Sequence, residues 1–354
     1  MDNSGQISAP GSLQPGAVIA PEAPRLPDRN LAEFAAQYGL KLSGQRPTLP
    51  RYLVTLWQRR HFIVGYATAR NVSMYTDAKL GQLWQVLTPL LNACVYYLIF
   101  GLLFEAAKGV ASYPAFLVAG VFVFAFTERS IVTGSTVMRA NLQLIRALYF
   151  PRASLPLAYV IVELQQMLVG MVVLVVIMAV SGEYPSWYWL LLFPAVLLQT
   201  MFNTGAALIV ARLGGSAADV SELIPFFLRI SRYFCGVMYL IITLPATLSN
   251  WERQVLSLNP MAVYISLVRV AFMRSYRTNS AGNQPYDQTR CDAFLAHPGG
   301  LIPGTRLHNI AWQAYCHAIV TNNDLWIAAA TWGVVFFLVG IVFFWQAEAK
   351  YGRG

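Results

Sequence analysis

One uncharged stretch in the first third of the chain limits what the chain can fold into. Residues 83–104, LWQVLTPLLNACVYYLIFGLLF, carry no charged side chain before Glu105. At about 1.5 Å of rise per residue, these 22 residues form a helix that crosses a hydrocarbon layer about 30 Å thick. The whole chain is 56% hydrophobic and 12% charged, with a mean hydropathy of +0.50. These features predict a helical membrane protein with several spans.

Five further apolar segments of similar length follow. They cover residues 113–137, 155–180, 189–211, 224–244 and 325–345. Six spans place both ends of the chain on the same side of the membrane. Nine basic residues precede the first span, one lies in the first outer loop and three lie in the first inner loop. Because inner loops carry the excess of Lys and Arg, we expect an inner (cytoplasmic) membrane protein with both termini in the cytoplasm.

Two segments precede the first span. Residues 1–50 are rich in Pro, Ala, Ser and Gly, without a charged start before an apolar core, and are expected to be a mostly disordered cytoplasmic tail rather than a cleaved signal peptide. In residues 51–82, apolar and basic side chains alternate at helical spacing. This pattern predicts a helix that lies in the membrane interface. A soluble amphipathic helix packed on another subunit is the alternative.

The region between the fifth and sixth spans differs from the rest. Residues 251–273 are apolar, but Asn259 and Pro260 give a cap and a first helical turn in their middle. Two short re-entrant helices on the outer side fit this pattern better than a span. An extracytoplasmic insertion is predicted at residues 274–323, and a cytoplasmic tail at residues 347–354.

Two of the four cysteines, Cys291 and Cys316, lie in this insertion. A compartment outside the cytoplasm is oxidising, and a disulfide that closes a loop of about 25 residues stabilises the fold by roughly 3 kcal/mol. We therefore predict a disulfide between them. Two free or metal-binding thiols are the alternative.

Charged residues also occur inside three of the predicted spans, and the third span carries one of them, Glu163. Glu128 and Arg129 interrupt the second span, and charges at that depth must face protein, water or an interface. Structural pairing and a role on a substrate path are both open. Arg229 and Arg232 are expected near the cytoplasmic entrance of the fifth span, where their long stems can reach the interface.

The sequence lacks the motifs of several common enzyme and binding sites. The chain contains no Gly-Lys-Ser/Thr phosphate loop, no HExxH and no GxSxG, and its four histidines form no convincing metal cluster in the sequence. The net charge of +9 is spread over loops and termini rather than along a stripe with stacking aromatics. We therefore expect neither an enzyme, nor a metal site, nor nucleic-acid binding.

Three short elements resemble one family. They are N-x-x-L-I through F-P-R-x-x-L-P at residues 141–156, L-G-x-L-W-x-x-L-x-P at residues 80–89, and L-N-P at residues 258–260 followed by Arg269. They are similar to the permease subunit of polysaccharide-exporting ABC transporters, which move O-antigen, teichoic acid, capsule or galactan chains. The resemblance covers roughly residues 51–273 and the last span. The insertion and the long N-terminal tail depart from the family pattern.

The resemblance implies a homodimer with two copies of a separate ABC ATPase, which holds the ATP and Mg, so that this chain binds no cofactor of its own. It also implies a coupling helix at residues 138–150 that contacts the ATPase. The residues expected at that contact are Arg139, Asn141, Leu144, Ile145, Arg146, Phe150, Pro151 and Arg152. At the outer mouth, a gate is implied at Asn259, Pro260 and Arg269.

Two further groups of residues follow from this family role. Aromatic faces suit a sliding sugar chain, because they offer apolar contacts without fixed hydrogen-bond partners. The channel candidates are Tyr96, Tyr97, Phe100, Phe122, Phe124 and Phe126, although aromatic residues in spans more often pack against neighbours or lipid. The candidates for the lipid head group are Arg59, Arg60 and Arg70, which membrane lipid could equally engage.

The sequence therefore favours the channel-forming permease of an ATP-driven exporter that moves a polyprenyl-phosphate-linked polysaccharide. Cell-wall galactan ranks first, because only four of the 25 basic residues are Lys and because the outer insertion is enlarged. O-antigen and teichoic acid export are the alternatives. A membrane enzyme or carrier of lipid-linked sugars that works without an ATPase is a further, different class.

Overall fold

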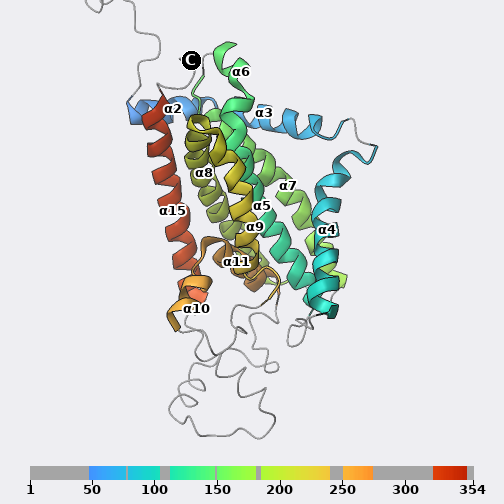
Figure 1. Ribbon diagram of the computed structural model, residues 1–354. Helices are drawn as coiled ribbons and strands as arrows, with labels where there is room; N and C mark the ends of the chain where they lie inside the picture. The colour runs from blue at the N-terminus through green and yellow to red at the C-terminus, as the bar shows by residue number, and fades with distance from the viewer. Residues whose placement is uncertain are drawn as a thin grey trace, which may run out of the picture. The chain divides into compact units, whose positions relative to one another are not determined.

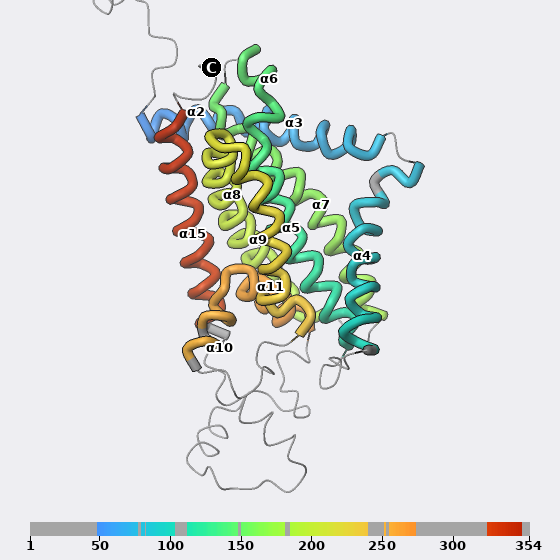
Figure 2. The backbone as a smooth tube through the Cα atoms, viewed as in Figure 1, coloured from blue at the N-terminus to red at the C-terminus, as the bar shows by residue number. Residues whose placement is uncertain are grey.

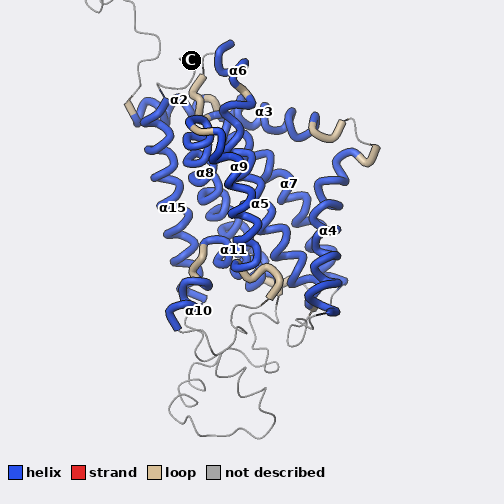
Figure 3. Tube along the Cα trace, viewed as in Figure 1, coloured by secondary structure: helices blue, strands red, loops and turns tan. Residues whose placement is uncertain are grey.

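The computed structural model describes residues 48–76, 79–103, 112–147, 150–180, 185–239, 250–273 and 322–348. All of them belong to the second of the two units, residues 1–45 and 46–354, into which the chain divides. Every regular element in the described part is a helix (Figures 1 and 3). The predicted all-α class is confirmed. The predicted disulfide between Cys291 and Cys316 lies outside the described residues.

Five helical segments in the described part are long and apolar enough to cross a membrane. They are Trp84–Leu102, Tyr113–Ala140, Ser154–Val180, Trp187–Ser216 and Asp324–Ala347. The elements that form them are α4 (Trp84–Tyr96) with η2 (Tyr97–Leu103), α5 (Tyr113–Ala140), α7 (Ser154–Val180), η3 (Trp187–Leu191) with α8 (Leu192–Ser216), and α15 (Asn322–Ala347). They match five of the six predicted spans, and the chain is a multi-pass membrane protein.

The predicted fifth span at residues 224–244 differs from the observed helix. Helix α9 (Ala218–Phe234) has 17 residues, about 25 Å in length, which is short of the roughly 30 Å hydrocarbon layer. The chain leaves the helix at Gly236, whose φ of +66° lies in the left-handed region that favours glycine. Because residues 240–244 lie outside the described part, the count of six spans stays a prediction.

Helix α5 lies at the centre of the bundle and packs against α4, α7, α8, α9 and α11. Its buried aromatic side chains, Phe116, Phe122, Phe124 and Phe126, form much of the core. Helices α8 and α15 run side by side at one edge and α4 stands at the other (Figure 2). The position of α5 follows from its composition, since it carries a large apolar residue on every face.

Short helices cover the two ends of the bundle (Figure 1). Helices α2 (Leu49–Gln58) and α3 (Arg60–Ser73) run across one end, which they share with α6 (Leu142–Ala147). The interfacial segment predicted at residues 51–82 is therefore two helices, which meet at Arg59. Tyr52 is the buried side chain of α2, and most of its other residues are exposed, as an amphipathic helix requires.

Helices α10 (Asn250–Ser257) and α11 (Pro260–Phe272) lie at the opposite end. The predicted break between two short helices is confirmed, with Pro260 at the first turn of α11 and the Asn259 side chain accepting the Met261 N–H at 3.0 Å. Helix α11 is buried against α5, α8 and α15. Re-entry of this pair into the membrane stays a prediction.

Candidate functional site

A cavity of about 120 Å³ lies between α4, α5 and α9. Its lining combines apolar side chains with hydroxyl, amide and charged groups. The lining residues are Thr88, Pro89, Asn92, Tyr96, Val121, Phe124, Ala125, Glu128, Arg129, Arg232 and Val237. Two of the six predicted channel aromatics, Tyr96 and Phe124, meet at this cavity. Glu128 and Arg129, for which a substrate-path role was also open, join them, and the sequence did not indicate the remaining lining residues.

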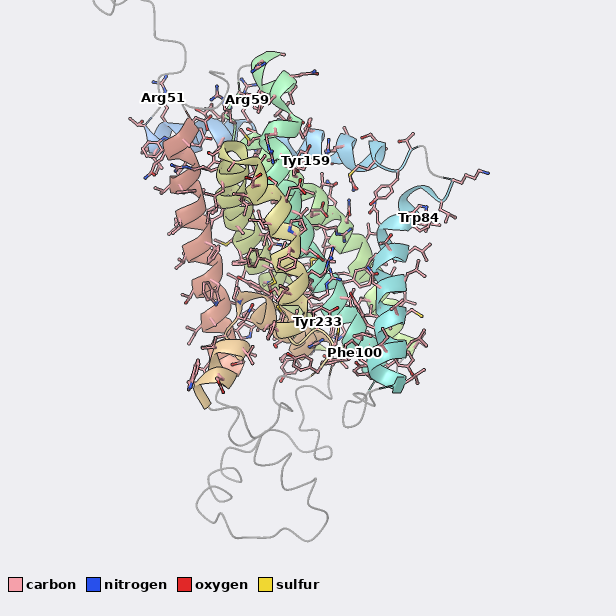
Figure 4. The ribbon with its side chains drawn as sticks, in the orientation of Figure 1. Arg51, Arg59, Trp84, Phe100, Tyr159 and Tyr233 are labelled. Carbon is pink, nitrogen blue, oxygen red and sulfur yellow. The ribbon has the colours of Figure 1, made fainter. Side chains whose placement is uncertain are left out.

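An ion pair between Glu128 of α5 and Arg232 of α9 forms part of this lining. The Arg232 guanidinium also donates to the Tyr96 hydroxyl of α4 at 2.6 Å and lies 5.2 Å from the centre of the Phe124 ring. The expectation that Arg232 lies at the entrance of its helix was wrong. Arg232 is close to the last residue of α9, and a partner at 104 residues' separation, which the local pattern cannot show, decides its position. Figure 4 places its neighbour Tyr233 near the α11 end of the bundle.

The second charge in this span, Arg129, has partners behind the cavity. Its guanidinium lies 3.4 Å from the Glu163 carboxylate and donates to the Gln166 side chain at 2.8 Å. Gln166 and Gln85 both donate to the Asn71 side-chain oxygen, at 3.4 and 3.3 Å. A polar network thus joins α3, α4, α5 and α7 inside the bundle. Both charges of the second span are paired and both line the cavity, so structural pairing is present, and a role on a substrate path stays a prediction.

The other predicted channel aromatics lie elsewhere. The Tyr97 ring packs 6.2 Å from the Tyr113 ring, measured between centres. Phe122 and Phe126 are buried in the core of this chain. Phe100 is half-buried at the far end of the helical segment that begins at Trp84 (Figure 4). The structure therefore gathers Tyr96 and Phe124 but not these four, and their place on a transport path stays a prediction.

The predicted coupling helix at residues 138–150 is not one continuous helix. Helix α5 runs to Ala140, and α6 covers Leu142–Ala147. Asn141, between them, donates to the Tyr159 hydroxyl of α7 at 3.0 Å and accepts from the Tyr66 hydroxyl of α3 at 3.1 Å. One side chain at the base of α6 therefore connects the interfacial helix to two spans.

The side chains of the coupling segment point in different directions. Ile145 is buried and Leu144 is half-buried, whereas Arg146 is exposed. Arg139 is directed into its own chain, where its guanidinium donates to the Ser221 hydroxyl of α9 at 2.7 Å. Arg146 therefore occupies an exposed position on α6, and Arg139 bonds to the start of α9. Their contacts with an ATPase stay predictions.

Phe150 and Pro151 lie between α6 and α7. The Phe150 ring packs 5.8 Å from the ring of Phe62 on α3. The Pro151 carbonyl accepts from the Ser154 N–H at 2.9 Å, which forms the turn that starts α7. These two predicted residues thus shape the path of the chain from the coupling segment into the third span.

Arg152 belongs to a polar cluster that the sequence did not reveal. Its backbone N–H donates to one Glu348 carboxylate oxygen at 2.9 Å, and the Tyr52 hydroxyl donates to the other at 2.8 Å. The Arg152 guanidinium donates to the Glu348 carbonyl. Burial raises the pKa of the Glu348 carboxyl and, more strongly, that of the Tyr52 hydroxyl. Helix α2, the end of α15 and the start of α7 are joined here.

The three arginines predicted at a lipid head group do not form one cluster. Arg59 and Arg60 are exposed where α2 meets α3, and the Arg60 guanidinium lies 5.4 Å from the exposed Trp57 ring. The Arg70 guanidinium instead lies 4.3 Å over the Tyr159 ring. Figure 4 shows Arg59 at the end of the bundle that α2 covers. Only the first two share an open, interfacial position.

Arg269, predicted at the outer gate, is buried on α11. Its guanidinium donates to the carbonyls of Phe116, Gly236 and Val237, at 3.2, 2.8 and 2.7 Å, and lies 3.4 Å over the Phe116 ring. Non-helical backbone at membrane depth is stable only where its polar groups find partners inside the protein. Arg269 supplies those partners to the segment that follows α9, and so joins α11, α9 and α5.

Apolar helices of spanning length, paired charges at their depth and a polar cavity between them define an integral membrane protein built around a polar interior site. The chain belongs to the ABC-2 type transporter family, whose model matches residues 63–273. The matched region begins in α3 and ends after α11, so it contains the cavity and the coupling segment. The family resemblance seen in the sequence is confirmed.

Curated relatives are similar to the chain over a comparable region. Two O-antigen export system permease proteins of Klebsiella pneumoniae are 30% and 28% identical over 200 residues, which are 56% of this chain and 75% of each relative. An O-antigen export system permease protein of Myxococcus xanthus is 23% identical over 227 residues, which are 64% of this chain and 83% of the relative. The chain thus covers most of the length of these permeases.

Proposed function

We propose that this chain is the channel-forming permease of an ABC exporter that moves a polyprenyl-phosphate-linked polysaccharide across the cytoplasmic membrane. It works as a homodimer with two copies of an ABC ATPase that hold ATP and Mg. The similarity to O-antigen export permeases over three quarters of their length carries this proposal. Cell-wall galactan is the first candidate cargo, and O-antigen and teichoic acid are the alternatives.

The geometry of the coupling segment, residues 138–150, supports the proposal that an ATPase drives this permease. Helix α6 connects two spans, and Asn141 at its base bonds to both Tyr66 and Tyr159. A displacement of α6 by the ATPase is therefore transmitted to α3 and α7 through the hydrogen bonds of Asn141. It is transmitted to α5 through the backbone, because α5 ends next to Asn141. Arg146 is exposed on α6, where a cation can pair with an acidic group of the ATPase.

The interfacial end of the bundle supports a lipid-linked cargo. Arg59 and Arg60 are exposed beside Trp57, a residue type that favours the head-group level of a bilayer. Arginine pairs strongly with phosphate when the pair is partly desolvated. These two side chains can receive the pyrophosphate of a carrier lipid as it approaches the first span.

Depletion of the protein tests the cargo. We expect long lipid-linked galactan to accumulate inside the cell while its shorter precursors stay at normal levels. Accumulation of a different glycan would replace galactan as the cargo and leave the exporter class intact.

Purification from native membranes tests the exporter class in the same strain. A P-loop ATPase should copurify with the wild-type chain and should be lost from the Arg146→Glu variant. Arg60→Glu, a charge reversal at another exposed position away from α6, should retain it. If no ATPase copurifies and no glycan accumulates, an ATPase-independent carrier or enzyme of lipid-linked sugars becomes the better explanation.

A further inference from the structure

Each charged side chain that lines the cavity between α4, α5 and α9 has a partner of opposite charge. Glu128 and Arg232 form one ion pair, and Arg129 is paired with Glu163, which lies just behind the wall. Two guanidinium groups therefore face two carboxylates. Arg229, one turn earlier on α9, is not among the lining residues. The two lining guanidinium groups are therefore compensated by Glu128 in the wall and by Glu163 behind it.

The remaining wall groups suit a polyhydroxylated ligand. Thr88 and Tyr96 offer hydroxyl groups and Asn92 offers an amide, while Pro89 and Phe124 provide apolar surface. Asn92 is exposed although it lies in the middle of an apolar span. A polar side chain at that depth marks a functional, solvated surface more often than a lipid-facing one. Sugar rings present hydroxyl edges and apolar faces, which match both kinds of wall.

The size of the cavity limits what it can hold. A volume of about 120 Å³ is below the range of about 300–1,000 Å³ that is typical of sites for drug-sized ligands. The volume therefore limits an occupant to no more than one small unit of a polymer at a time.

We propose that this cavity is a subsite for one uncharged sugar unit and that its compensated charges discriminate against polyanionic chains. The inference rests on the proposed function and deepens it, because it selects neutral glycans over phosphate-bearing polymers such as teichoic acid. A phosphate or sulfate in the cavity would face the Glu128 carboxylate at short range and low dielectric, which is unfavourable. To bind it, Arg232 would have to give up its partner and leave that carboxylate uncompensated.

Thiol protection in lipid nanodiscs tests this selectivity on the full complex with its ATPase. The reporter is Asn92→Cys in a Cys94→Ser background, alkylated with uncharged N-ethylmaleimide. The matched control is Val95→Cys, which is also exposed on α4 but does not line the cavity. The two probes are a neutral galactose tetrasaccharide and its sulfated counterpart.

We expect the neutral tetrasaccharide to slow alkylation of Asn92→Cys but not of Val95→Cys. The sulfated probe should need a concentration at least about tenfold higher for the same protection, because the Glu128 carboxylate in the cavity wall repels its sulfate groups. Adding Glu128→Gln leaves a net positive site and should remove or reverse that difference. Adding both Glu128→Gln and Arg232→Gln restores neutrality and should return the preference for the neutral probe.

Three results would overturn the subsite: equal protection by both probes without further substitution, no effect of Glu128→Gln, or equal protection of the Val95→Cys control. If neither probe protects but depleted cells still accumulate lipid-linked glycan, the subsite fails and the proposed function stands. If neither probe protects and no glycan accumulates, both fail.

Discussion

Helices α15 and α4, at opposite edges of the bundle, are attached in different ways. Helix α15 meets α8 backbone to backbone. A Cβ placed on Gly205 of α8 would lie 2.1 Å from the Phe336 carbonyl oxygen, and one on Gly340 would lie 2.4 Å from the Gly205 oxygen. Such close approach through small residues is a main source of helix association in membranes, where apolar side chains gain nothing by leaving lipid.

Helix α4 is held mainly by side chains. Gln85 donates to Asn71 of α3, and the Tyr96 hydroxyl accepts from Arg232 of α9, while the cavity separates part of α4 from α5. Pro89 interrupts its hydrogen bonding, and the segment Tyr97–Leu103 is π-helical. Proline and π-helical turns are common where a helix bends at a functional site.

The difference indicates which edge can move. Separating α8 from α15 removes many close backbone contacts at once, whereas shifting α4 breaks a few hydrogen bonds that water or a sugar can replace. We therefore expect α8 and α15 to act as a rigid frame and α4 as the adjustable wall of the cavity.

The largest expected effect comes from a methyl group in the tight seam. Gly205→Ala should destabilise the protein by about 3 kcal/mol, because the new Cβ meets backbone that cannot rotate away. The matched control is Gly65→Ala on α3, where an added Cβ would meet no atom of another element within 4 Å. The higher helix propensity of Ala should stabilise this variant by about 0.5–1 kcal/mol. Thermal unfolding in nanodiscs measures both. Equal melting of Gly205→Ala and wild type would show that the frame is not rigid.

A smaller effect is expected at the attachment of α4. Asn71→Leu removes the acceptor for Gln85 and Gln166 and should cost about 1–2 kcal/mol. Amide hydrogen exchange should then rise in α4 and stay unchanged in α15. Thr68→Ala, which removes one exposed bond on the same helix, serves as the control. Faster exchange in α15 as well would contradict the division into frame and wall.

The smallest effect concerns the pH dependence of stability at the C-terminal end of α15. Because burial raises the pKa of Glu348, folding favours its protonated form. That contribution to stability is complete below the ordinary carboxyl pKa of 4.5 and is lost as the pH rises through the raised pKa. Unfolding curves between about pH 4.5 and pH 8 should therefore show wild type losing stability relative to Glu348→Gln. If the stability of wild type and of Glu348→Gln changes with pH in the same way, Glu348 does not contribute a pH-dependent term to the attachment of α15.

The sequence by itself determined the elements whose signals are local. Apolar runs of spanning length predicted the helices that form α4, α5, α7, α8 and α15, because the hydrocarbon layer sets one length for all of them. Asn259 and Pro260 predicted the break between α10 and α11, because a cap and a first-turn proline act within one helical turn. The family motifs predicted the ABC-2 assignment.

Only the tertiary structure decided which charges meet and where α9, the helix at the predicted fifth span, ends. Arg232 reaches Glu128 across 104 residues, and the Arg152 backbone reaches Glu348 across 196. The segment after α9 can leave the helix because Arg269, from another helix, satisfies its carbonyls. At membrane depth a charge or a free carbonyl is stable only beside its partner, and helical periodicity carries no information about partners that lie far away in the chain.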